Sequence, residues 1–125
     1  MKQIISTPNA PHAIGPYSQA VEANGFVFVS GQIPIVPATG QMPDGIEAQT
    51  EQVMRNIGAI LEAAGLTYSN VVKTTVLLKS IADFATMNGI YAKYFTADCP
   101  ARAAFEVAAL PKGALIEVEV IAAKN

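Results

Sequence analysis

The chain has 125 residues, of which 51% are hydrophobic and only 14% are charged. Its formal net charge is −2, and its eight lysine and arginine residues form no cluster that could neutralise many phosphates, which argues against nucleic acid as a main partner. Cys99 is the only cysteine, so no disulfide can form within the chain, and no apolar run approaches the roughly 18 residues that a membrane-spanning helix needs. We therefore expect one cytoplasmic domain over residues 1–125, with no membrane partner, whose weakly charged surface is partly covered by other copies of the chain.

The N-terminal third predicts three short strands joined by loops. Residues 2–5 are a strand candidate, and residues 9–18 contain the prolines and glycine of an ordered loop. Two β-prone runs then flank Asn24-Gly25, which is the strongest short signal for a β-hairpin. Three prolines and two glycines within residues 32–45 predict a further loop.

A long helix is predicted over residues 44–65. Asp44 and Glu47 have the spacing of a capping box, in which each side chain satisfies a free backbone N–H, and Gly65 is placed to end the helix. Apolar side chains recur at helical spacing, at Val53, Ile57, Ile60, Leu61 and Ala64.

The second half predicts three strands and one more helix. Residues 70–79 are rich in β-branched side chains and predict a strand. Ser80 and Asp83 repeat the capping-box spacing and open a helix that runs to about Phe95. The last two strands are predicted at residues 101–108 and 115–122. The order β-β-β-α-β-α-β-β is typical of an α+β domain in which two helices cover one face of a mixed sheet, so the other face needs water or a partner.

The alternation of side chains along the last two strands raises a question about Arg102. If the apolar faces of these strands, including Ala103 and Phe105, meet the helices, four charged side chains project from the helix-free face: Arg102, Glu106, Glu117 and Glu119. A guanidinium offers a planar fork for a carboxylate, so Arg102 is a candidate to bind an acidic small molecule. The alternative is a surface ion pair with Glu106 or Glu119 that has no further role.

Asn88 is a second unusual position. It lies four residues after Phe84 and three before Tyr91, on the apolar face of the predicted helix. A buried amide must be hydrogen-bonded, so Asn88 either bonds a nearby loop or strand or lines a pocket.

No metal site or cofactor is expected. His12 is the only histidine, and together with Cys99 it supplies no recognisable zinc pattern. Residues 31–40 lack the Lys-Ser/Thr of a P-loop and do not follow the Rossmann pattern. Any chemistry must therefore use Arg, Glu, Tyr, Ser or Asn side chains, backbone groups and water.

Four segments resemble one known family. The segments "AIGPYSQA" (residues 13–20), "VSGQIP" (29–34), "TMNGIYAKYF" (86–95) and "PARAAFEVAALPKGALIEVEVIA" (100–122) occur in the order and spacing of the RidA family, the YjgF-type reactive intermediate deaminases. The resemblance covers nearly the whole chain, and its final block is highly specific. It implies a chorismate-mutase-like α+β fold, assembled as a homotrimer with clefts between subunits.

The same resemblance implies an activity and its catalytic residues. The family hydrolyses 2-imino acids, such as 2-iminobutanoate and 2-iminopropanoate that arise from pyridoxal-phosphate enzymes, to 2-keto acids and ammonia. The chain would then be a cofactor-independent hydrolase whose partner is a small 2-imino acid. Arg102 matches the arginine that binds the substrate carboxylate, and Glu117 is the candidate to position and deprotonate a water. Tyr17 matches a tyrosine that the adjacent subunit would contribute to the cleft. It would close the cleft and assist proton transfer.

Four further residues match positions that line the family's substrate cleft: Ser30, Gly31, Asn88 and Ala104. Ser30 and Asn88 would support the cleft or bond the substrate, and Gly31 would shape the cleft through its backbone. Many relatives carry a cysteine where this chain has Ala104, and Cys99 does not replace it. We expect the backbone at Ala104 to be the part that contributes, so the substitution should be mild.

Two other functions stay open. Ribonuclease or translation-inhibitor activity is also ascribed to relatives, although the acidic net charge argues against it, and a steep salt dependence of RNA binding would support it. The third hypothesis is a non-catalytic trimer that binds a small carboxylate or a partner protein, which would need Arg102 but not Glu117.

Overall fold

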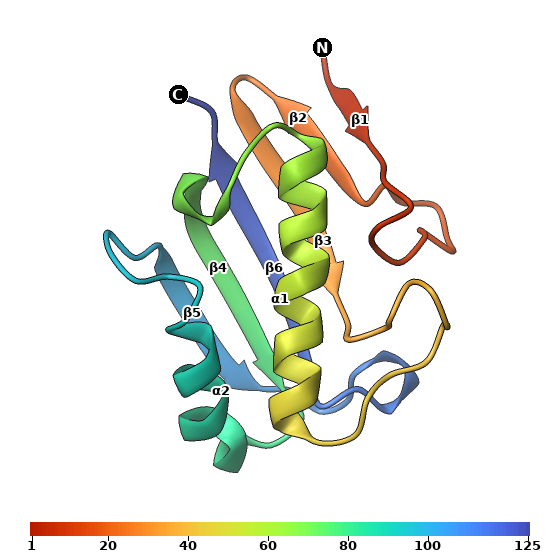
Figure 1. The fold of residues 1–125 in the computed structure, drawn as a ribbon, viewed down its shortest axis with the longest axis vertical. Coiled ribbons are helices and arrows are strands. Elements are labelled where there is room, and N and C mark those ends of the chain that lie inside the picture. Colours follow the sequence, from red (N-terminus) through yellow and green to blue (C-terminus); the bar gives the residue numbers. More distant parts are fainter.

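Six strands form one sheet, and both α-helices cover the same face of it (Figure 1). The strands are β1 (Gln3–Ile5), β2 (Ala20–Ala23), β3 (Phe26–Gln32), β4 (Val71–Leu78), β5 (Ala101–Glu106) and β6 (Ile116–Ala123), and the helices are α1 (Ile46–Ala63) and α2 (Phe84–Tyr91). In this computed structural model, which describes all 125 residues, the strand order is β1-β2-β3-β6-β4-β5. Only β4 and β5 pair in parallel. The predicted α+β class, with a mixed sheet and two helices on one face, is confirmed.

The hairpin predicted at Asn24-Gly25 joins β2 and β3. Ala23 pairs with Phe26, and the two residues between them have positive φ, 51° at Asn24 and 80° at Gly25. A two-residue turn with positive φ at both positions matches the right-handed twist of the flanking strands, which explains the preference for Asn-Gly here.

One side of α1 packs on the sheet and supplies much of the core. Five of its apolar side chains are completely buried: Val53, Met54, Ile57, Ile60 and Leu61. Burying each such side chain stabilises the fold by about 1.5–3 kcal/mol. The helix ends as predicted, because Gly65 has a φ of 77° and the amide of Leu66 donates to the carbonyl of Leu61 at 2.8 Å.

The capping box predicted at Asp44 and Glu47 is wrong. The residue that precedes α1 is Gly45, at a φ of 88°, and no side chain caps the first turn. Asp44 therefore lies one residue too early to reach the free amides. Gln49 fastens the start of the helix instead, since its Nε2 donates to the carbonyl of Pro43 at 3.0 Å and its Oε1 accepts from the amide of Leu115 at 2.8 Å.

The second helix is shorter than predicted, because α2 ends at Tyr91 rather than near Phe95. The predicted box at Ser80 is replaced by a 3-10 turn over Ile81–Asp83, in which the Ser80 hydroxyl accepts from the amide of Ala82 at 3.3 Å. No side chain caps α2 itself.

The predicted orientation of the fifth strand is wrong. Arg102 pairs in register with Thr74, which is completely buried on the helix side of β4, so Arg102 and Glu106 face the helices. Glu117 and Glu119 of β6 lie on the helix-free face, as expected. The reason is that β5 is the edge strand, and its more apolar side, with Phe105, faces away from α2.

The helix-free face keeps large aromatic side chains in solvent. Phe26, Phe28 and Phe105 are 42%, 45% and 48% exposed. A hollow of about 210 Å³ lies on this face between the aromatic side chain of Phe28 and the charged side chains of Lys73 and Glu119. So much exposed aromatic area on one face indicates a surface that meets another molecule. Neither helix combines the length and hydropathy needed to cross a membrane.

Candidate active site

Arg102 is held by one side of α2. Its Nη1 donates to Oδ1 of Asn88 at 2.7 Å, and its guanidinium carbon lies 4.8 Å from the ring centroid of Tyr91 and 5.3 Å from that of Phe84. We call these four side chains the Arg102 cradle. The prediction that Asn88 is a buried amide is wrong, because Asn88 is exposed. Its side-chain carbonyl oxygen accepts the hydrogen bond from Arg102.

No carboxylate neutralises Arg102. The two ion pairs of the chain are Lys93–Glu51 and Lys124–Glu22. Glu106, four residues after Arg102 on β5, accepts a hydrogen bond from the amide of Ile81 at 2.9 Å instead. The surface ion pair that the strand pattern allowed is therefore absent, and the guanidinium keeps unused donors for an external acid.

The backbone beside Arg102 is also free on one side. β5 is the last strand of the sheet, so its outer edge has no partner strand. The amide of Val107 donates inward to the carbonyl of Leu78 at 2.9 Å. Because amides alternate in direction along a strand, the amide of Ala104 points away from β4 toward this open edge.

Three other predicted residues line a second site. Tyr17, from the loop before β2, Gly31 of β3 and Glu117 of β6 border a hollow of about 510 Å³, which we call the Glu117 hollow. The pairing of β3 with β6 shifts register between Val29 and Gln32, which places Gly31 in a bulge. A Cβ at Gly31 would lie only 2.9 Å from Cδ of Glu117, so glycine leaves room for this carboxylate.

The pKa of Glu117 is raised above its ordinary value. Partial burial raises the pKa above its usual range, and the neighbouring Glu119 raises it further. A carboxylate that binds a proton more readily than usual is better suited to act as a general base near neutral pH.

Ser30 lies beside the Glu117 hollow but does not line it. Its hydroxyl donates to the carbonyl of Ser18 at 2.6 Å, and its amide donates to the carbonyl of Gln19 at 2.9 Å. These two bonds fix the end of the loop that carries Tyr17. Ser30 is therefore placed to support this loop.

The chain does not bring the two groups of residues together. Arg102, with Asn88, lies on the helix side at the β5 edge, whereas Glu117 lies on the helix-free face of β6. Sequence reasoning missed Tyr91 and Thr74, which complete the surroundings of Arg102. The i, i+4, i+7 spacing of Phe84, Asn88 and Tyr91 was a usable signal, but only once the position of α2 over β5 was known.

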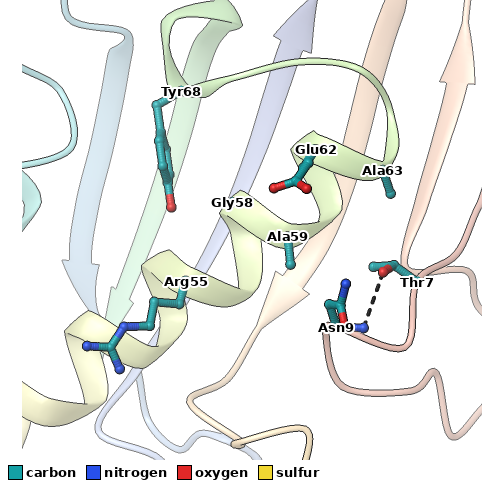
Figure 2. A pocket seen from close by; sticks show the side chains of 8 residues that line it. All are labelled: Thr7, Asn9, Arg55, Gly58, Ala59, Glu62, Ala63 and Tyr68. Carbon is teal, nitrogen blue, oxygen red and sulfur yellow. Dashed lines mark hydrogen bonds between the residues drawn. The ribbon is translucent and has the colours of Figure 1, made fainter.

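A third hollow, of about 470 Å³, lies on the outer side of α1 and contains none of the predicted site residues (Figure 2). Tyr68 forms one wall, and its hydroxyl donates to the carbonyl of Met54 at 2.5 Å. Burial raises the pKa of Tyr68 to about 12, so the phenol stays neutral. Nowhere in the chain do three His, Cys, Asp or Glu side chains gather closely enough to hold a metal ion.

The sequence model of the family described as Endoribonuclease L-PSP matches residues 7–124. The chain belongs to this family. Its members include the RidA and YjgF-type proteins that the four motifs resemble, which confirms the recognition made from sequence.

Relatives in the L-PSP family carry more specific names. The 2-iminobutanoate/2-iminopropanoate deaminase of Mus musculus is 50% identical over 126 residues, covering 100% of this chain and 93% of the mouse protein. The chloroplastic Reactive Intermediate Deaminase A of Arabidopsis thaliana is 55% identical over 97% of this chain, which spans only 65% of that longer protein. The crystal structure of E. coli TdcF with bound serine superposes with a TM-score of 0.95 at 42% identity, covering 98% of this chain and 99% of TdcF.

Proposed function

We propose that this chain is a 2-iminobutanoate/2-iminopropanoate deaminase, a hydrolase that converts 2-imino acids to 2-keto acids and ammonia. One observation carries the proposal: Arg102 is oriented by Asn88, and no carboxylate of the chain pairs with it. The substrate carries the missing carboxylate, which a guanidinium can bind through two parallel hydrogen bonds. The names of relatives at about half sequence identity support the same reaction.

The chemistry requires one water and one proton acceptor. The water oxygen attacks C2 of the protonated imine, the π pair of the C=N bond moves to nitrogen, and a water proton passes to Glu117. The carbinolamine then takes this proton on nitrogen, and the C2–N bond breaks with its electron pair on the leaving ammonia. The hydroxyl proton passes to Glu117, which leaves the 2-keto acid, and Glu117 then gives this proton to ammonia to form ammonium. Arg102 holds the substrate carboxylate throughout, so the reacting carbon stays in place.

The site is shared between two copies of the chain. Because Arg102 and Glu117 lie on opposite faces of one sheet, one small imino acid does not reach both within a single chain. In the proposed homotrimer, one subunit contributes Arg102, Asn88 and the amide of Ala104 to each cleft. Its neighbour contributes Tyr17, Gly31 and Glu117, with Ser30 behind them.

The helix-free face supports this assembly. Its exposed Phe26, Phe28 and Phe105 supply apolar area for contact between copies. The same face carries Glu117, so burying it would move the Glu117 hollow into a subunit boundary. The low content of charged residues, 14%, fits a chain of which one face is covered.

Imine turnover tests the proposal directly. An amino-acid oxidase or dehydratase generates 2-iminobutanoate in situ, and semicarbazide traps the imine that is left. Wild type should accelerate its loss, whereas Arg102→Ala should reduce kcat/KM on the order of 100-fold, because two charge-assisted hydrogen bonds are removed. Acceleration by Arg102→Ala equal to that by wild type would refute the carboxylate clamp.

Hybrid assemblies test the shared site. Arg102→Ala and Glu117→Gln chains are co-expressed with different affinity tags, and assemblies that carry both tags are isolated. Every closed trimer that carries both tags has one cleft of three with both functional side chains, so activity should return to about a third of that of wild type. Activity that stays at the level of the parent variants would place both side chains in one chain's site.

The remaining hypotheses predict different results. A carboxylate-binding module would bind 2-oxobutanoate through Arg102 without accelerating imine loss. A ribonuclease would bind RNA with a steep salt dependence and cleave it. We propose that the protein acts in the cytoplasm, because a chain with a single cysteine and no internal disulfide suits a reducing compartment. The Arabidopsis relative, by contrast, is named as chloroplastic.

A further inference from the structure

Arg102 rests on one stripe of α2. Phe84, Asn88 and Tyr91 are spaced i, i+4 and i+7, so all three side chains lie on one side of the helix, where they contact the guanidinium. Asn88 supplies a hydrogen bond, and the two rings supply cation–π contacts. Tyr91 is the nearer of the two rings, at 4.8 Å, and it is only 7% exposed.

Tyr91 is held in turn by a buried hydroxyl. Oγ1 of Thr74 lies 2.8 Å from the phenol oxygen of Tyr91, and Thr74 is completely buried. Thr74 is also the register partner of Arg102 across the parallel pair β4–β5. The body of the Tyr91 ring packs on Phe95, with ring centroids 4.7 Å apart. The ring is therefore fixed both at its tip and along its side.

We propose that Tyr91 is a positioning residue for Arg102: its ring supports the guanidinium in the orientation that binds the substrate carboxylate, and Thr74 fixes the ring. Neither Tyr91 nor Thr74 needs to touch the substrate, since both are buried. Asn88 takes a hydrogen bond from Nη1, which leaves the other donors of the guanidinium for the carboxylate. This inference rests on the proposed function, because it assigns that carboxylate to the imino acid.

The first test removes the ring. Tyr91→Leu should raise KM for 2-iminobutanoate about five- to tenfold, with kcat changed less, because a lost cation–π contact weakens carboxylate binding by about that factor. Phe95→Leu is the matched control, since Phe95 is equally buried, at 7% exposed, and packs on Tyr91, but makes no contact with the guanidinium. Equal increases of KM in both variants would overturn the proposal, because they would reflect general loosening of the core.

The second test separates orientation from stability. Tyr91→Phe and Thr74→Val each leave one buried hydroxyl without its partner and should lower Tm, whereas the double variant removes both hydroxyls and should recover most of the Tm. If the hydroxyl contact orients the ring, KM stays raised about two- to threefold in the double variant. Recovery of KM together with Tm would show that the contact only stabilises the fold, and would overturn the assignment of Thr74.

The third test does not depend on turnover. NMR relaxation of the Nε–H group of Arg102 in the substrate-free protein reports how rigidly the side chain is held. Wild type should be rigid and Tyr91→Leu mobile, and the dissociation constant of 2-oxobutanoate should rise in the same variant. An equally rigid Arg102 in Tyr91→Leu overturns the inference and leaves the deaminase proposal standing. Absence of imine turnover by wild type, with mobility that still depends on Tyr91, refutes the deaminase proposal alone.

Discussion

Replacing Gly31 with alanine is expected to disable Glu117 while the fold stays intact. The new Cβ would lie 2.9 Å from Cδ of Glu117, and ordinary contact begins at 3.4 Å, so Cδ must move by at least about 0.5 Å, the difference between the two. The carboxylate oxygen Oε2 is closer still and moves further. A misplacement approaching 1 Å in a reacting group costs on the order of 100-fold in rate.

The stability of this variant should change little. Gly31 has no positive φ, so alanine fits its backbone, and the displaced group is the end of a flexible side chain. We expect a free energy of unfolding within about 1 kcal/mol of wild type. Gly89→Ala is the matched control, because a Cβ there meets nothing within 4 Å, and this variant should keep full activity.

Two assays together test whether Gly31→Ala disables Glu117 in a folded protein. Thermal unfolding establishes that Gly31→Ala is folded, and imine turnover measures kcat/KM. The double variant Gly31→Ala/Glu117→Gln should be no slower than Glu117→Gln alone, since both changes act on one carboxylate. A folded Gly31→Ala protein with wild-type kcat/KM would refute the reasoning, as would full additivity in the double variant.

Three further predictions concern single side chains. Glu119→Gln removes a charge that raises the pKa of Glu117, so the acid limb of the kcat/KM profile should move to lower pH; an unmoved limb would mean that burial alone sets this pKa. Arg102→Lys keeps the charge but loses the planar fork, so kcat/KM should fall at least about tenfold, and full activity in steady-state assays would count against bidentate binding. Gly58→Ala places a Cβ 2.9 Å from Cζ of Tyr68, so it should lower the free energy of unfolding by about 1–3 kcal/mol in urea titrations, and an unchanged value would show that Tyr68 moves aside without cost.

Local signals predicted the elements well. The Asn24-Gly25 turn and the apolar spacing of α1 are properties of short stretches of chain, and both appear where the sequence places them. The caps were harder, because a capping box depends on which residue begins the helix. A shift of one residue, from Asp44 to Gly45, is enough to remove it.

The orientation of Arg102 could not be predicted from alternation alone. Strand alternation separates two faces, but it does not say which of them meets the helices. The assumption that the more apolar face is the inner one fails for β5, because that strand lies at the edge and its Phe105 faces a surface outside the chain's own core. The contact of Arg102 with Asn88 depends on where α2 crosses β5, which is a tertiary property.

The placement of Arg102 and Glu117 on opposite faces of one sheet has a consequence for how activity depends on dilution. The proposed shared site would exist only while copies are associated, so specific activity should be constant at high protein concentration and fall steeply below the dissociation constant of the assembly. Newly synthesised chains would be inactive until they associate with one another. The amount of protein in a compartment would thus control not only how many sites are present, but whether any site is complete.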